Sequence, residues 1–376
     1  MKKNRKKINI VSPVLPKLSE ISTELREILK NGHLTNNAKY VPAFEKKMEE
    51  YLGVKHCVAL ANGMLALVLA LKAMGLKGEV ILPSFTFSAT AHAVVWAGLT
   101  PVFADIDPET FNIDPEDIER KITPETCAIL PVNTYGNVCN IEALNNISEK
   151  HNLKVLYDSA HALGTVYKGR RVGGSGSAEM FSFHATKILP AGEGGLISTN
   201  DTELYEKLLL YRVFGAEGGD NDCILAGFNG KMPEFSAILA LKGLSKLDHY
   251  IKTRKTAAER LYAGLKKLKG IKFQEIHPGT IINHQYFPVI IDENEFGASR
   301  DEVFEFLKQD DIIARKYFYP PIHKYTCYNN LNTGTLENTE YVSERIMCLP
   351  FYSDMKKSDV NRIIKAFKDI SRRVKK

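Results

Sequence analysis

The sequence predicts an α/β fold in which a large domain with a mainly parallel central sheet precedes a smaller C-terminal α/β domain. From about residue 55, short apolar runs alternate with helical stretches, and a new pattern begins after residue 248. Strands joined by helical crossovers form mainly parallel sheets that are covered on both faces. A chain of 376 residues is long enough for two cores. We therefore place the domains at 1–248 and 249–376.

The elements of the large domain follow from this alternation. The stretch 64–74 is apolar on nearly every side, which predicts a buried helix. The predicted strands are 57–60, 80–82, 101–105, 128–132, 154–158, 181–183 and 196–199. The other predicted helices are 88–97, 141–150, 207–214 and 233–247.

The smaller domain has its own pattern. A long amphipathic stretch, 250–268, leads into it, and a strand is expected at 285–291. Helices are expected at 300–308 and 358–374.

Charge and composition exclude several classes of function. The net charge is +6, but nine positive charges lie in residues 1–7 and 372–376, and the rest of the chain carries −3. The body of the protein therefore has no strong basic field, and we expect no nucleic-acid partner. No apolar run reaches the roughly 18 residues that a membrane span needs, and the basic N-terminus lacks the apolar stretch of a secretion signal.

The six cysteines are far apart and include no C-x-x-C pair. This spacing argues against a zinc site or a disulfide framework, so we expect no metal. It fits a reducing compartment, and we expect a cytoplasmic protein.

Lys187 is the principal candidate for chemistry. It follows a β-rich run, Phe181–Phe183, and precedes the glycine-rich turn Gly192-Glu193-Gly194-Gly195. A lysine held in a cleft can form a Schiff base with an aldehyde cofactor. Most lysines are solvated surface charges, so neighbouring signals must support this interpretation.

Asp158 provides the first of these signals. It ends an apolar strand, where a carboxylate needs a partner. The protonated ring nitrogen of pyridoxal phosphate (PLP) would be such a partner, because a Schiff-base lysine and an aspartate are the recurring pair around this cofactor. The alternative is that Asp158 only caps the strand or a turn.

Other residues at strand ends suit the rest of this cofactor. Asn62-Gly63-Met64 opens the buried helix, whose free N–H groups would bind a phosphate. Ser182 offers a hydroxyl to the same phosphate, and Phe87 could stack on a flat heterocycle. The alternatives are an ordinary helix start, a strand serine bonded to backbone and a core phenylalanine.

The order of these motifs resembles the DegT/DnrJ/EryC1/StrS family of PLP-dependent sugar aminotransferases, which have the aspartate aminotransferase fold. The resemblance spans roughly residues 30 to 355. The motifs that carry it are 62–67, 83–87, 134–137, 157–162, 182–187, 192–195, 227–231 and 345–350.

The resemblance implies a role for each matching residue. Lys187 would form the Schiff base and later move a proton, and Asp158 would pair with the ring nitrogen. The further cofactor contacts would come from Gly63, Met64, Phe87, His161, Ser182 and, across a homodimer, Asn229 of the neighbouring subunit. Contacts to substrate would come from Lys231 and, within the segment 315–323, from Tyr319 and His323.

Two positions depart from the family's usual pattern. Met64 stands where threonine is common, so one hydroxyl contact to the phosphate would be absent. Asn133 stands where histidine is frequent, which leaves the role of that side chain open. Lys187 itself is kept, whereas dehydrating members carry histidine there.

The resemblance implies transfer of an amino group from glutamate to a nucleotide-linked keto-deoxysugar in deoxyamino-sugar and polysaccharide biosynthesis, such as that of O-antigen. The expected site is C4 of a 4-keto-6-deoxyhexose, with C3 of a 3-keto sugar as the alternative. A non-catalytic PLP-binding regulator would need a DNA-reading domain, for which no segment remains. An oxidoreductase would need a glycine fingerprint that 173–176 does not provide.

Overall fold

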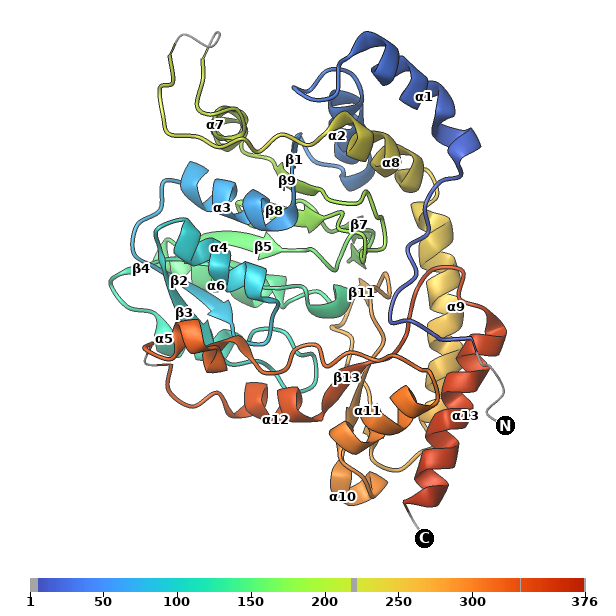
Figure 1. Ribbon diagram of the computed structural model, residues 1–376. Helices are drawn as coiled ribbons and strands as arrows, with labels where there is room; N and C mark the ends of the chain where they lie inside the picture. Colours follow the sequence, from blue (N-terminus) through green and yellow to red (C-terminus); the bar gives the residue numbers. More distant parts are fainter. Residues whose placement is uncertain (1–5, 218–221, 332, 375–376) are drawn as a thin grey trace.

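The large sheet has seven strands and confirms the predicted architecture. In the computed structural model, which describes residues 6–217, 222–331 and 333–374, it lies at the centre of the molecule (Figure 1). Across the sheet the strands are β1 (His56–Leu60), β9 (Gly195–Thr199), β8 (Ala178–Ser182), β5 (Lys154–Asp158), β4 (Thr126–Ile129), β2 (Glu79–Pro83) and β3 (Thr100–Ala104). Only β9 runs antiparallel to its neighbours; the other pairs are parallel.

The helices of this unit cover both faces of the sheet. They are α1 (Leu18–Asn31), α2 (Tyr40–Leu52), α3 (Gly63–Ala73), α4 (Ser88–Trp96), α5 (Pro115–Lys121), α6 (Ile141–His151), α7 (Thr202–Arg212) and α8 (Glu234–Leu244). Because side chains alternate along a strand, Val58 packs with α3, α4 and α7, whereas its neighbour Cys57 packs with α2 and α8. Helices α5 and α6 cover the second face beside β4 and β5.

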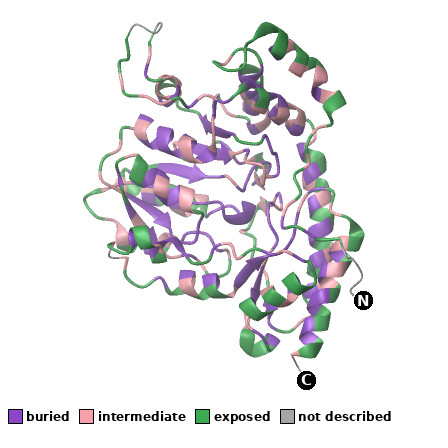
Figure 2. Cartoon of the chain, viewed as in Figure 1, coloured by how far each residue is buried: buried purple, intermediate pink, exposed green. Residues whose placement is uncertain are grey.

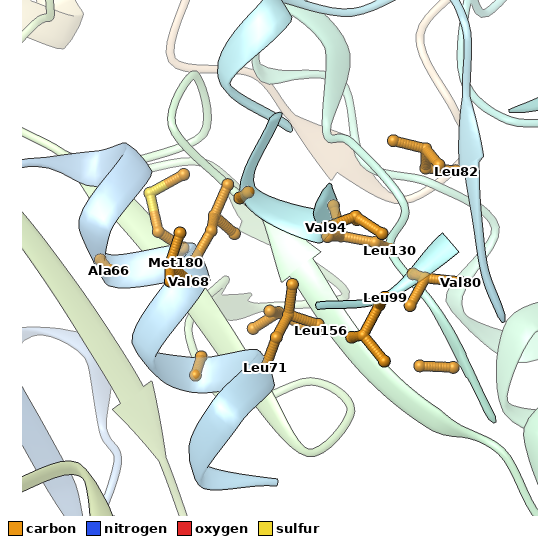
Figure 3. Packing of buried hydrophobic residues seen from close by; sticks show 14 of the residues in the cluster. Ala66, Val68, Leu71, Val80, Leu82, Val94, Leu99, Leu130, Leu156 and Met180 are labelled. Atoms are coloured by element: carbon orange, nitrogen blue, oxygen red, sulfur yellow. The ribbon is translucent and has the colours of Figure 1, made fainter. Parts of the chain in front are cut away.

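Helix α3 lies flat on the sheet. Its residues Ala66, Val68 and Leu71 pack beside Val94 of α4 and Leu156 of β5, as Figure 3 shows. All five are buried. A helix that is apolar all round is stable only in such a position, so the sequence pattern and the packing agree.

A second core lies beside the first. Its antiparallel sheet has the order β10 (Ile271–Lys272), β12 (Pro288–Ile291) and β13 (Ile346–Cys348). Its helices are the second half of α9 (Leu247–Leu265), α10 (Glu293–Phe296), α11 (Arg300–Gln309) and α13 (Lys357–Arg373). The buried positions of α13 and of the second half of α9 face this core, and the exposed positions of both helices face outward (Figure 2).

Three segments connect the two cores. Leu247 of α9 belongs to the first core and Leu261 to the second. Ile8 pairs with Ile312 and joins the second core from the N-terminal side. Ile322, Tyr328 and Leu336, which precede α12 (Glu337–Arg345), pack in the first core. The division at 248/249 therefore stays a prediction, since segments from each side of it enter the other core.

The remaining elements are small. A three-stranded sheet has the order β11 (Thr280–Ile281), β6 (Val166–Tyr167) and β7 (Arg170–Arg171). Short 3-10 turns lie at Thr134–Gly136, Ile322–Lys324 and Thr326–Tyr328. The basic ends 1–5 and 375–376 lie outside the described residues, and no helix among the described residues could cross a lipid bilayer.

Candidate active site

One pocket of about 450 Å³ collects most of the predicted site residues. It lies beyond the carboxyl ends of β5 and β8 and at the starts of α3 and α4, which is where open α/β sheets bind ligands. Of the predicted residues, those on its wall are Gly63, Met64, Phe87, Asp158, His161, Ser182 and Lys187. Two larger hollows, of about 660 and 680 Å³, contain none of these residues, so chemistry rather than size identifies the site.

Lys187 lies in a tight turn that follows β8. The turn closes through hydrogen bonds from the Lys187 N–H to the His184 carbonyl (2.8 Å) and from the Ala191 N–H to the Phe183 carbonyl (2.8 Å). Burial lowers the pKa of the Lys187 amine to about 8, although the nearby Asp158 charge raises it. Burial has this sign because it disfavours the charged ammonium. A neutral amine is the nucleophilic form, so this environment prepares Lys187 for reaction with an aldehyde.

Asp158 lies at the end of β5 with its carboxylate in the pocket wall. Its Oδ2 accepts from the Thr90 hydroxyl at 2.9 Å, and its Oδ1 accepts from the Ala160 N–H at 3.1 Å. Burial raises the pKa of Asp158, while these bonds and the Lys187 charge lower it. The hydrogen bond from the Ala160 N–H is one that a turn residue makes, and it agrees with the alternative that Asp158 caps a turn. A buried carboxylate on a pocket wall can also accept a protonated ring nitrogen.

His161 is held neutral with a defined tautomer. The Tyr135 N–H donates to its Nδ1 at 3.2 Å, so the proton of the neutral ring is on Nε2. Burial places the pKa of His161 well below its ordinary value, and the Lys187 charge adds to the effect. The ring lies nearly parallel to those of Tyr135 and Phe318. His161 can therefore offer an N–H donor to a ligand.

The start of α3 forms the end of the pocket that suits a phosphate. The Asn62 side chain caps the Leu65 N–H at 2.9 Å, while the first N–H groups of a helix have no partner within it. A Cβ on Gly63 would lie 3.2 Å from the Ser182 Cβ, so glycine permits the close approach of α3 to β8. A Cβ on Gly195 would lie 2.4 Å from the Asn62 carbonyl oxygen, so β9 needs glycine there as well.

These groups together fit PLP. The helix start and the Ser182 hydroxyl suit its phosphate, Asp158 its ring nitrogen and Lys187 its aldehyde. Phe87 is 55% exposed and lines the pocket, so it is available to the face of a ring and is not a core residue.

Four predicted residues are not on the pocket wall. Asn229 pairs with Val213, and the Lys231 amine lies 4.7 Å from the centre of the Phe214 ring. Tyr319 is exposed beneath the Arg300 guanidinium.

His323, the fourth, is buried between two partners. Its Nδ1 lies 2.7 Å from the Ser84 hydroxyl and its Nε2 lies 3.2 Å from Glu340. Both ring nitrogens of His323 therefore already have partners. The structure does not support the predicted contact of His323 with the substrate. Ser84 is fully buried, so this array of serine, histidine and glutamate has no access to a substrate.

The pocket also contains residues to which the sequence assigned no individual role, although three of them lie in the segment 315–323 that the resemblance implied for the substrate side. Thr90 lies in the first turn of α4, just after the N-cap residue Phe87, and faces the same pocket. Tyr286, Arg315, Tyr317 and Phe318 form the wall opposite the large domain. The described residues provide no carboxylate as an ion-pair partner for Arg315.

The side chain of Asn133 has a structural role. Its Nδ2 donates to the Ser159 hydroxyl at 2.8 Å, and its Oδ1 accepts from the Cys139 N–H at 2.9 Å. Asn133 is buried and does not line the pocket.

Comparison with known proteins identifies the family. The model of the DegT/DnrJ/EryC1/StrS aminotransferase family matches residues 17–368. The chain belongs to this family. It is therefore a PLP-dependent aminotransferase, as the sequence motifs predicted.

Individual relatives are similar over nearly the whole chain. A dTDP-4-amino-4,6-dideoxy-D-glucose transaminase of Shigella dysenteriae is 40% identical, over 97% of this chain and 99% of its own. A GDP-perosamine synthase of Caulobacter vibrioides is 34% identical, over 92% and 93%. The crystal structure of DesI in the presence of its TDP-sugar product has a TM-score of 0.94 at 34% identity, over 99% of this chain and 95% of that one.

Proposed function

We propose that this protein transfers the amino group of glutamate to C4 of a nucleotide-linked 4-keto-6-deoxyhexose. The observation that carries the proposal is the buried Lys187 amine, which shares a pocket with Asp158, His161 and the start of α3. The relatives named for 4-amino-4,6-dideoxyglucose and perosamine support a sugar substrate of this kind.

PLP, when bound, supplies an electron sink that stabilises negative charge on the carbon next to the transferred nitrogen. Asp158 would keep the ring nitrogen protonated. The N–H groups of Gly63 and Met64, with the Ser182 hydroxyl, would hold the phosphate, and Phe87 would cover the ring face.

Lys187 Nζ would act as the general acid and base. A pKa of about 8 leaves an appreciable neutral fraction near neutral pH, so Nζ can take up a proton from one carbon and return it to another. His161 would donate from Nε2 and stay neutral while the amine changes charge, because its pKa is far below that of Lys187. The aromatic side chains of Tyr286, Tyr317 and Phe318 would exclude water while the proton is transferred.

The test is incubation with glutamate and a panel of 4-keto and 3-keto nucleotide sugars, followed by mass spectrometry of the products. Amination at C4 is expected. Exclusive amination of 3-keto sugars would replace the C4 assignment, and amination only of ketones without a nucleotide would refute the substrate class.

We also propose a homodimer whose two subunits share each site, with Asn229 reaching the cofactor phosphate of the neighbouring subunit. Large apolar side chains near that residue are exposed in the single chain, including Phe214 (50%) and Phe235 (37%). A partner surface would cover them.

Mixed dimers test the shared site. Lys187→Ala and Asn229→Ala are each expected to be nearly inactive, but subunit exchange between them creates one site with both native residues. Activity should return on mixing. If the mixture stays as inactive as its components although exchange occurs, the two residues act in the same subunit.

A further inference from the structure

A short segment of the second unit, residues 283–285, passes behind the turns that carry His161 and Lys187. Asn283 and Gln285 are fully buried. The Asn283 amide donates to the carbonyls of His161 (2.8 Å) and Leu163 (2.9 Å), and its Oδ1 accepts from the Gln285 N–H at 2.9 Å. The segment therefore connects the second unit to the backbone of the active site without lining the pocket.

Gln285 holds the chain on both sides of Lys187. Its Oε1 accepts from the Ile188 N–H at 2.8 Å, and its Nε2 donates to the Thr186 carbonyl at 3.2 Å. The planar amide of Gln285 thus bonds the peptide groups immediately before and after Lys187. Lysine has four rotatable side-chain bonds, so the place that its Nζ reaches depends on how firmly its backbone is fixed.

Arg254 in turn fixes the backbone of Gln285. Its Nη1 donates to the carbonyls of Gln285 (2.9 Å) and His284 (3.1 Å), and its Nε donates to the Ser353 hydroxyl at 2.9 Å. Burial lowers the pKa of Arg254 to about 10, and no carboxylate of the described residues forms an ion pair with it. A buried charge without a counter-ion is costly, which indicates that these carbonyl contacts matter to the fold.

We propose that Gln285 is a positioning residue whose amide fixes the Lys187 turn and so directs Nζ toward the reacting atoms. The inference rests on the role of Lys187 in the proposed function. Misplacing a reacting group by about 1 Å can cost about 100-fold in rate. The loss of the two Gln285 hydrogen bonds should therefore affect catalysis far more than binding.

The ordinary alternative is that Gln285 only satisfies buried backbone groups. Gln274, which is half-buried, offers a control of the same residue type, because its Nε2 also bonds two carbonyls, those of Thr110 (2.7 Å) and Thr134 (3.2 Å), away from the Lys187 turn. If only packing matters, Gln285→Leu and Gln274→Leu should behave alike.

The first measurement uses the protein without cofactor or substrate. The Lys187 amine is labelled with acetic anhydride across a pH series, and its peptide is quantified by mass spectrometry. In the native protein the midpoint should lie near pH 8. In Gln285→Leu we expect it to rise by about one pH unit, since a freed amine reaches water and regains its charge more easily. In Gln274→Leu it should not move.

The second measurement is turnover of the loaded enzyme. Gln285→Leu should lower kcat by about 100-fold with KM changed less than about threefold. Gln285→Glu keeps the size and the acceptor for the Ile188 N–H but loses the donor to the Thr186 carbonyl. It should give a smaller loss of the same kind, and it decides the matter if the leucine variant does not fold.

Two results would overturn the proposal. One is a folded Gln285 variant with the native labelling midpoint and native kcat. The other is a Gln274→Leu variant that loses as much as Gln285→Leu. The labelling requires no sugar, so a failure of the proposed sugar substrate would leave this result intact.

Discussion

The two walls of the active-site pocket are built differently. The large-domain wall consists of strand ends and helix starts, and it carries Asp158, Ser182 and Lys187 in a fixed register. The opposite wall consists of segments from the second unit, and it presents Tyr286, Arg315 and Tyr317. A regular sheet thus fixes the groups proposed to bind the cofactor, whereas irregular segments shape the side proposed to face the substrate.

The largest test of this comparison is Lys187→Ala. It removes the proposed proton carrier, and general acid–base catalysis is typically worth 10²- to 10⁴-fold. We expect glutamate-dependent turnover to fall by at least about 10³-fold, and borohydride reduction to leave no pyridoxyl adduct on this peptide. Lys154→Ala, at the exposed start of β5, is the control. Turnover that survives in Lys187→Ala would remove the lysine from the mechanism.

Gly195→Ala tests the rigidity of the large-domain wall. The new Cβ would lie 2.4 Å from the Asn62 carbonyl oxygen and 2.9 Å from the Gly63 nitrogen, so the start of α3 must shift. We expect about 1–3 kcal/mol less stability, as for other overpacked positions, and about tenfold weaker PLP binding by absorbance titration. Gly174→Ala is the control, because Gly174, like Gly195, has no positive φ and the nearest atom to its new Cβ would be the Asn200 Nδ2 at 3.3 Å. Native PLP affinity in Gly195→Ala would mean that this wall tolerates movement.

Arg315→Leu tests the opposite wall. The guanidinium lines the pocket and is suited to a carboxylate or a phosphate. We expect KM for glutamate or for the nucleotide sugar to rise about tenfold, because a lost hydrogen bond to a charged group is worth about 1.5–3 kcal/mol. PLP affinity should not change. A loss of PLP binding with unchanged KM values would show that both walls serve the cofactor.

The pH dependence of stability tests whether Lys187 is buried in the large-domain wall. The pKa of Lys187 is about 8 in the folded chain and about 10.5 in the unfolded chain, so between these values the unfolded chain binds more protons. In the protein without cofactor, this group should therefore make stability rise with pH from about 8 to 10.5, by up to about 1.4 kcal/mol per unit. The free energy of unfolding, measured with urea at pH 8 and pH 10, should show this increase in the native protein. In Lys187→Met the increase should be absent. Equal slopes would mean that the amine is solvated.

Much of the large domain could be predicted because its pattern is local. The helix predicted at 64–74 is α3, and the strand predicted at 154–158 is β5. Helices α1 and α2 were not predicted. Helix α2 packs on the sheet through spaced apolar residues such as Phe44 and Met48, and α1 packs on α8. Their polar outer faces leave a weaker signal.

The antiparallel direction of β9 also could not be predicted from the sequence. Its apolar run resembles those of its parallel neighbours, and the hydrogen-bond partners of a strand are set by residues far away in the chain. The short connection from β8 to β9 through the Lys187 turn accompanies this reversal.

The sequence by itself determined the cofactor chemistry of this protein. Lys187, Asp158, Gly63 and Ser182 follow strand ends, and parallel strands bring such ends to one edge. Only the tertiary structure decided the rest. Within the segment 315–323, which the resemblance implied for the substrate side, it placed Arg315 and Tyr317 on the pocket wall but not Tyr319. It also enclosed His323 between Ser84 and Glu340 and brought Gln285 behind Lys187. Contacts between segments about 100 or more residues apart depend on how two cores pack together, and no local pattern records that arrangement.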